Sequence, residues 1–144
     1  MERPYSFSIR LSYRKGRAEL SRFVAFRVGE RPLALRIEDV LGFAREIKWC
    51  RLPFAPRGVV GIANWRGRIC PLIDPGVFLD TISGGGPWVC ACQGSAGPIA
   101  ILVDSVMGIE TGEITPVSQP PFIGIYGEGR LVLDAKEIER LCGI

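Results

Sequence analysis

The sequence predicts a mainly β fold built from small β-barrels, with a short helix at its C-terminal end. Apolar and polar residues alternate along several short segments, which is the spacing of half-buried strands. Glycine and proline are frequent (Gly 18, Pro 11) and are scattered between these segments, as turn residues are. The 144 residues, 47% of them apolar, suit one domain that folds without disulfide bonds. Many short strands with such turns and little helix favour barrels.

Residues 1–19 form a polar lead-in ahead of a single domain that we expect over residues 20–144. In this lead-in Glu2 and Glu19 oppose a larger set of cations: Arg3, Arg10, Arg14, Lys15 and Arg17. The simpler interpretation is a solvated tail without fixed structure. The alternative is a basic arm that contacts an acidic partner.

The first strands are predicted to form a hairpin. Residues 21–28 alternate with their apolar side chains on one face, residues 29–32 have the composition of a turn, and residues 32–37 alternate again. The stretch 37–52 begins with helical spacing, which Gly42 interrupts. We therefore predict one helical turn followed by a strand.

A second hairpin is predicted from residues 59–65 and 68–74, which flank a tight turn. Pro71 lies inside the second of these strands and has no N–H for sheet pairing, so we predict an edge strand or a bulge there. The glycine-rich residues 84–87 are predicted to form a flexible loop.

Two further hairpins and a helix complete the prediction. Residues 88–93 pair with 98–106, and residues 122–126 pair with 130–134, each around a turn that contains glycine.

A helix follows the last hairpin. Asp134 can cap its start, and Glu137 stands three residues later, as a capping box requires. An apolar stripe runs to Cys142, and Gly143 is suited to end the helix.

The chain lacks the residues that catalysis and metal binding commonly use. It has no histidine, its cysteines form no C-x-x-C pair, and its aspartates are isolated in sequence, so we expect no enzyme, no metal and no cofactor. The cysteines are interpreted as free, buried thiols of a reducing cytosol: Cys50, Cys70, Cys90, Cys92 and Cys142. A polar start and the absence of a long apolar run favour a cytoplasmic protein that inserts into no membrane.

A small barrel that binds nucleic acid is the alternative function. Arg66-Gly67-Arg68 follows Trp65, and such a mixture of cations and rings can stack on bases. The net charge of +3 is mild, however, and acidic residues interrupt the cations. These features favour protein binding over nucleic acid.

The stretch from Leu52 to Asp74, LPFAPRGVVGIANWRGRICPLID, resembles the core signature of CheW-like domains. In that signature an L-P-x-x-P loop leads to a strand ending G-[VI]-x-N-[LI]-R-G, followed by an apolar strand with an internal proline and a final aspartate. The matching positions are Leu52, Pro53, Pro56, Gly61, Ile62, Asn64, Arg66, Gly67, Pro71 and Asp74. Blocks at 23–40, 98–109 and 130–141 are also similar to the family, so the resemblance covers about residues 21–143.

The resemblance implies two small five-stranded β-barrels packed side by side, roughly 20–80 and 81–144, with a short C-terminal helix. It also implies a non-catalytic, stand-alone adaptor that couples chemoreceptors to a CheA-type histidine kinase. The implied partners are the CheW-like regulatory domain of the kinase and the cytoplasmic signalling tip of methyl-accepting chemoreceptors. Such an adaptor is recruited from the cytoplasm to membrane-associated receptor arrays and binds no cofactor.

The resemblance also implies roles for particular residues. Partner contact is expected of Val40, Leu41, Asn64, Trp65, Arg66 and Gly67. Arg66 either bonds backbone carbonyls across the barrel mouth or contacts the partner, and Trp65 is either a hot-spot anchor or part of the core. Structural roles in turns, caps or close backbone approaches are expected of Gly61, Asp74, Asp104 and Asp134.

Three positions depart from the family pattern. Gly42 stands where the family commonly has an acidic residue associated with receptor contact. Trp65 replaces the usual aliphatic residue, and Pro75 follows the final aspartate where leucine is usual. These departures indicate a divergent member with a different receptor, or one that serves a non-flagellar pathway such as surface motility.

Overall fold

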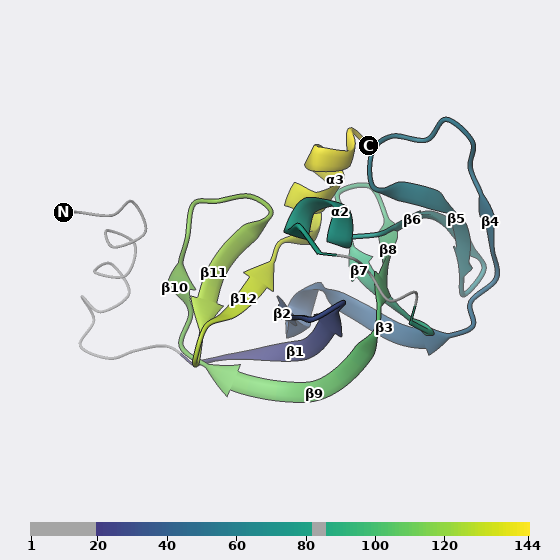
Figure 1. Ribbon diagram of the computed structural model, residues 1–144. Coiled ribbons are helices and arrows are strands. Elements are labelled where there is room, and N and C mark those ends of the chain that lie inside the picture. The colour runs from purple at the N-terminus through teal and green to yellow at the C-terminus, as the bar shows by residue number, and fades with distance from the viewer. Residues whose placement is uncertain (1–19, 82–85) are drawn as a thin grey trace.

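The computed structural model describes residues 20–81 and 86–144, which form two β-sheets packed together (Figure 1). The lead-in 1–19 and part of the loop predicted at 84–87 lie outside the described residues. The mainly β prediction with a C-terminal helix is confirmed. Within the described ranges, no helix is long and apolar enough to cross a membrane.

The first sheet combines the two ends of the domain. Its strands, in spatial order, are β10 (Thr115–Pro116), β11 (Phe122–Tyr126), β12 (Arg130–Leu133), β2 (Arg31–Arg36), β1 (Ser21–Val28) and β9 (Ser105–Gly112). The hairpins β1–β2 and β11–β12 are antiparallel, as predicted, and β12 joins them by a parallel pairing with β2.

The second sheet comes from the middle of the chain. Its strands, in spatial order, are β3 (Val40–Arg45), β7 (Trp88–Gln93), β8 (Pro98–Val103), β6 (Arg68–Ile73), β5 (Val59–Trp65) and β4 (Trp49–Arg51). The predicted helical turn is the 3-10 helix η1 (Ile37–Asp39), which connects the two sheets ahead of β3. A short helix that was not predicted, α2 (Gly76–Leu79), follows β6.

The strand order corrects two details of the expected architecture. Each sheet has six strands instead of five, and among the described residues the order of hydrogen-bonded strands is open. The boundary expected near residue 80 does not separate the sheets, because β1 and β2 pair with strands from the last third of the chain. Alternation within a strand says which face is apolar, but not which distant strand becomes its neighbour.

Pro71 does not mark an edge strand, because β6 lies between β5 and β8. Nor does the irregularity of the β5–β6 pairing lie at Pro71; it lies between Val59 and Gly61. The sheet tolerates the proline because the parallel pairing with β8 begins only at Leu72. The missing N–H at Pro71 therefore lies just outside that ladder.

The strand predicted over 98–106 is two strands in two sheets. β8 ends at Val103 in the second sheet, and β9 begins at Ser105 in the first. Asp104 is the junction at which the chain passes from one sheet to the other. The long curved path of β9 is visible at the bottom of Figure 1.

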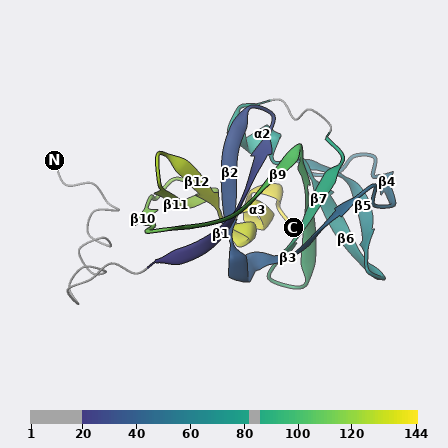
Figure 2. The same cartoon turned by 90° about the horizontal axis from the view of Figure 1, so that it is seen from below.

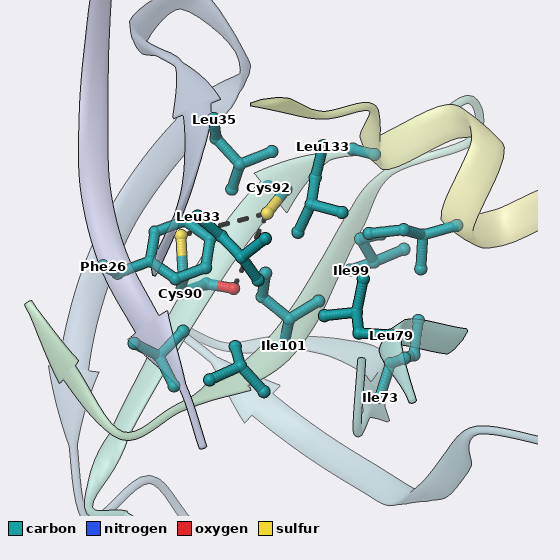
Figure 3. Close-up of a cluster of buried hydrophobic side chains, with 14 of the residues drawn as sticks. Phe26, Leu33, Leu35, Ile73, Leu79, Cys90, Cys92, Ile99, Ile101 and Leu133 are labelled. Atoms are coloured by element: carbon teal, nitrogen blue, oxygen red, sulfur yellow. Dashed lines mark hydrogen bonds between the residues drawn. The ribbon is translucent and has the colours of Figure 1, made fainter. Parts of the chain in front are cut away.

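The main core lies between the two sheets (Figure 3). Phe26 and Leu35 enter it from the first sheet, and Ile99 and Ile101 enter it from the second; all four are buried. Burying each such side chain contributes about 1.5–3 kcal/mol. This shared core explains why the two sheets form one domain.

The helix α3 (Ala135–Cys142) closes this core where the sheets meet (Figure 2). The Asp134 carboxylate accepts a hydrogen bond from the Lys136 N–H at 3.1 Å, and Gly143 ends the helix with φ 75°. The reciprocal half of the capping box is not formed. Glu137 instead accepts from Arg140 at 2.7 Å, while the N–H of Asp134 donates to the Pro121 carbonyl.

The cysteines are free, and all but one are buried. Cys90 and Cys92 share a face of β7, as predicted, with their sulfurs 3.9 Å apart in the core (Figure 3). Burial raises the pKa of the Cys142 thiol to about 11, so this thiol is neutral at physiological pH. Cys50 on β4 is exposed, which corrects the expectation that every thiol is buried.

Candidate partner-binding site

A tight turn between β5 and β6 presents Arg66 to solvent. Trp65 and Arg68 pair across the hairpin, so Arg66 and Gly67 alone form the turn, with φ values of 49° and 85°. Two consecutive residues with positive φ match the twist of a two-residue hairpin. The side-chain oxygen of Asn64 accepts a hydrogen bond from the Gly67 N–H at 2.8 Å, which stabilises the turn.

Trp65 is a core residue, only 6% exposed, and it packs in a second cluster with Ala63, Cys70 and Leu72. It is therefore not itself an exposed anchor. The Arg66 guanidinium lies over its ring, 4.7 Å from the centroid, at the distance of a cation–π interaction. Among the described residues, the Arg66 side chain makes no hydrogen bond to a carbonyl and no ion pair.

The start of β3 approaches this turn from the opposite end of the same sheet. The pairing with β7 shifts register between Val40 and Gly42, so Leu41 is the extra residue of a bulge and is 38% exposed. An ideal Cβ at Gly42 would lie 3.0 Å from Cη2 and Cζ2 of Trp65 and 3.5 Å from Nη2 of Arg66. We call the surface made by Val40, Leu41, Gly42, Asn64, Trp65, Arg66 and Gly67 the turn surface.

The structure thus brings Gly42, the neighbour of Leu41, close to Trp65 and Arg66 of the turn. Leu41 has an exposed apolar side chain, and Arg66 has an exposed positive charge. Their sequence neighbours are held inside: Val40 packs against the main core, and Trp65 lies buried in the second cluster. The surface can form apolar and ionic contacts. Across the described residues, no group of three or more potential ligands could hold a metal ion.

Asp104 ties three segments together at the junction of the sheets. Its carboxylate accepts hydrogen bonds from the N–H groups of Gly29 and, at 2.8 Å, of Gly86. Its own N–H donates to the Arg27 carbonyl at 2.9 Å. The half-buried carboxylate therefore connects the β1–β2 turn, the segment before β7 and the β8–β9 junction.

Replacing Asp104 with alanine is expected to lower the free energy of unfolding by about 2 kcal/mol, because backbone N–H groups lose a charged acceptor. Urea denaturation would measure this loss. Glu128→Ala, at an exposed position in the β11–β12 turn, is the control and should change stability by less than about 0.5 kcal/mol. Equal effects of the two substitutions would contradict a structural role for Asp104.

Asp74 and Gly61, two further predicted structural positions, belong to the β5–β6 region of the second sheet. The Asp74 carboxylate accepts a hydrogen bond from the Gly76 N–H at 2.9 Å and so holds the turn into α2. Gly61 is a close approach: a Cβ there would lie 2.2 Å from the Cys50 carbonyl oxygen and 2.7 Å from the Trp49 ring. Only glycine lets β4 and β5 pair at this separation.

The sequence analysis missed an apolar groove on the outer face of β5 and β6. It has a volume of about 330 Å³ and is lined by Leu52, Ile62, Ile69, Pro71 and Ile144, among others. Ile69 is 70% exposed, and Phe54 projects fully into solvent from the neighbouring loop. One residue in the sequence could have indicated this groove. Ile69 lies on the outer face of β6, opposite the inward-facing Cys70 and Leu72, and a large apolar residue on an outer face is typical of an interface.

Comparisons with known proteins found a matching family, a related sequence and a similar structure. A sequence model of the family described as "CheW-like domain" matches residues 22–134. The chemotaxis protein CheW of Helicobacter pylori (strain ATCC 700392 / 26695) is 34% identical over 56 residues, which is 39% of this chain and 34% of that relative. The matched stretch therefore spans about a third of the relative's length.

A solved structure has the same fold. The scaffolding protein TtCheW from Thermoanaerobacter tengcongensis superimposes with a TM-score of 0.76 over 88% of this chain and 97% of that chain, at 20% sequence identity. The two-sheet arrangement is thus shared at low sequence similarity.

Proposed function

The chain belongs to the CheW-like domain family, and from this membership we propose that it is a non-catalytic adaptor that couples chemoreceptors to a CheA-type histidine kinase. The family match over residues 22–134 is the observation that carries the proposal. In this role the chain acts in the cytoplasm, where it joins receptor arrays through protein contacts.

An adaptor needs two separate surfaces on one rigid body, and the second sheet offers two. The turn surface lies at the end of the β5–β6 hairpin, while the apolar groove runs along the outer face of the same strands. We assign the turn surface to the receptor's cytoplasmic signalling tip, because it combines Leu41 with the exposed cation of Arg66. We assign the groove to the kinase's CheW-like regulatory domain, because exposed apolar side chains such as Ile69 and Phe54 mark protein interfaces.

Modest affinities are sufficient for this role. When a rigid adaptor holds two partners at once, the second contact forms at a high effective concentration, so the assembly is tighter than either contact alone. The core shared by the two sheets supplies that rigidity.

Direct titration tests the proposal. The purified chain is titrated against the kinase's CheW-like regulatory domain, against a receptor-tip fragment and against an oligonucleotide, each at two salt concentrations. We expect micromolar binding to both proteins and none to the oligonucleotide. Binding to neither protein, with salt-sensitive binding to the oligonucleotide, would favour the nucleic-acid alternative instead.

A further inference from the structure

The cations between residues 40 and 73, Arg66 of the turn surface among them, have no carboxylate partners within the described chain. From residue 40 to residue 73 the only acidic side chain is Glu46, whereas the exposed basic ones are Arg45, Lys48, Arg51, Arg57, Arg66 and Arg68. None of these cations forms an ion pair in the described part of the molecule. Elsewhere among residues 20–81 and 86–144 the ion pairs are Arg36–Asp39, Arg130–Glu110 and Arg140–Glu137.

Several of these unpaired cations rest on aromatic rings. Arg66 lies 4.7 Å from the ring centroid of Trp65, and Arg45 lies 5.3 Å from that of Trp88. A guanidinium stacked on a ring is held in place but keeps its charge and most of its hydrogen-bond donors. These arginines are therefore positioned cations whose donors still face solvent.

The Trp65 ring also explains the glycine at position 42. A Cβ at Gly42 would meet the ring at 3.0 Å, which is tighter than most real Cβ contacts, so a larger side chain at 42 requires the ring to move. Two of the departures from the family pattern are therefore in contact and complementary in volume. Their joint effect is electrostatic: the tryptophan holds Arg66 and leaves no room for an acidic side chain 3.5 Å from Nη2 of that arginine.

We propose that Gly42 and Trp65 together determine partner specificity, by presenting Arg66 as an uncompensated cation that selects a receptor segment carrying a carboxylate opposite it. This inference rests on the proposed adaptor function and specifies the partner chemistry of the turn surface. Trp65 is the positioning residue, Arg66 makes the contact, and Gly42 keeps the neighbouring space free of negative charge. Complementarity between the unpaired cations and an acidic segment supplies the selectivity.

A matched pair of double variants tests this inference. Both variants carry Trp65→Leu, which removes the ring that a side chain at position 42 would meet. One variant also carries Gly42→Glu, and the other carries Gly42→Gln. The two variants differ only in charge, because the added carboxylate can form an ion pair with Arg66 and the amide cannot. We expect the glutamate variant to bind the receptor-tip fragment at least tenfold more weakly than the glutamine variant, with a difference that shrinks at high salt.

The binding of the kinase's regulatory domain serves as the internal reference, and both variants should bind it equally. Equal binding of the tip fragment by the two variants, when the unsubstituted chain binds that fragment, would overturn the inference and leave the adaptor function standing. Failure of the unsubstituted chain to bind the tip at all would overturn both.

A second measurement covers the case in which the double variants do not fold. Arg66→Ala is combined with tip fragments in which single Asp or Glu residues are changed to Asn or Gln. One such pair should show affinity losses that are less than additive, which identifies the carboxylate opposite Arg66. Additive losses for every pair would overturn the inference.

Discussion

An Arg66→Ala variant is expected to bind the receptor-tip fragment about thirtyfold more weakly, a loss of about 2 kcal/mol, as for a charged hot-spot contact. The fold should be unchanged, because the Arg66 side chain is exposed and its described contact is with the face of Trp65. Titration calorimetry measures the affinity, and urea denaturation checks the stability.

Arg22→Ala is the matched control for this variant. It removes the same charge from an exposed position on β1, in the other sheet, so the tip affinity should change by less than about twofold. A large loss of stability in Arg66→Ala would show that this arginine is structural. Equal affinities of the two variants would show that the turn surface does not contact the receptor.

Replacing Gly61 with alanine is expected to lower the free energy of unfolding by about 3 kcal/mol, because the new methyl group overlaps the Cys50 carbonyl and forces β4 away from β5. Amide hydrogen exchange should show lost protection in β4 (Trp49–Arg51), a short strand at the edge of its sheet. Urea denaturation gives the magnitude.

Gly127→Ala is the control for Gly61→Ala, because it separates the effect of a steric clash on stability from the effect of backbone strain. Gly127 has φ 59° and nothing within 4 Å of an ideal Cβ, so its substitution introduces strain without a clash and should lower stability by about 1 kcal/mol. If Gly61→Ala were no more destabilising than Gly127→Ala, the close approach of β4 and β5 would not control stability.

Local patterns in the sequence predicted the hairpins and the last helix well. The alternation in β5 and β6 follows from their two faces, whereas the middle residues of β1 and β2 are buried on both faces. Asp134 and Gly143 mark the ends of α3, as predicted. The same patterns did not predict the length of β9. This strand continues to Gly112 through Met107 and Ile109, which are exposed although they are apolar.

Local sequence patterns could not predict which strands belong to which sheet. A single strand was predicted over residues 98–106, whereas the chain changes sheets within it, at Asp104. The parallel pairing of β12 with β2 joins segments about a hundred residues apart, and no local spacing encodes such a contact.

The resemblance predicted which residues form the turn surface, but it did not predict how these residues are arranged. Gly42 and Trp65 lie on strands at different positions of the sheet, and their contact depends on how that sheet curls. The signal in the sequence was that both positions depart from the family pattern. The structure supplies the physical link, which is that the tryptophan ring occupies the space that the glycine leaves.

The central claim is that one chain holds a receptor and a kinase at the same time. To test it, the receptor-tip fragment is immobilised, the chain is bound to it, and the kinase's CheW-like regulatory domain is then passed over the surface. The account predicts that the kinase domain is retained only where the chain is present, without displacing the chain from the tip. Release of the chain by the kinase domain would mean that the partners compete for one surface, which would contradict the adaptor function.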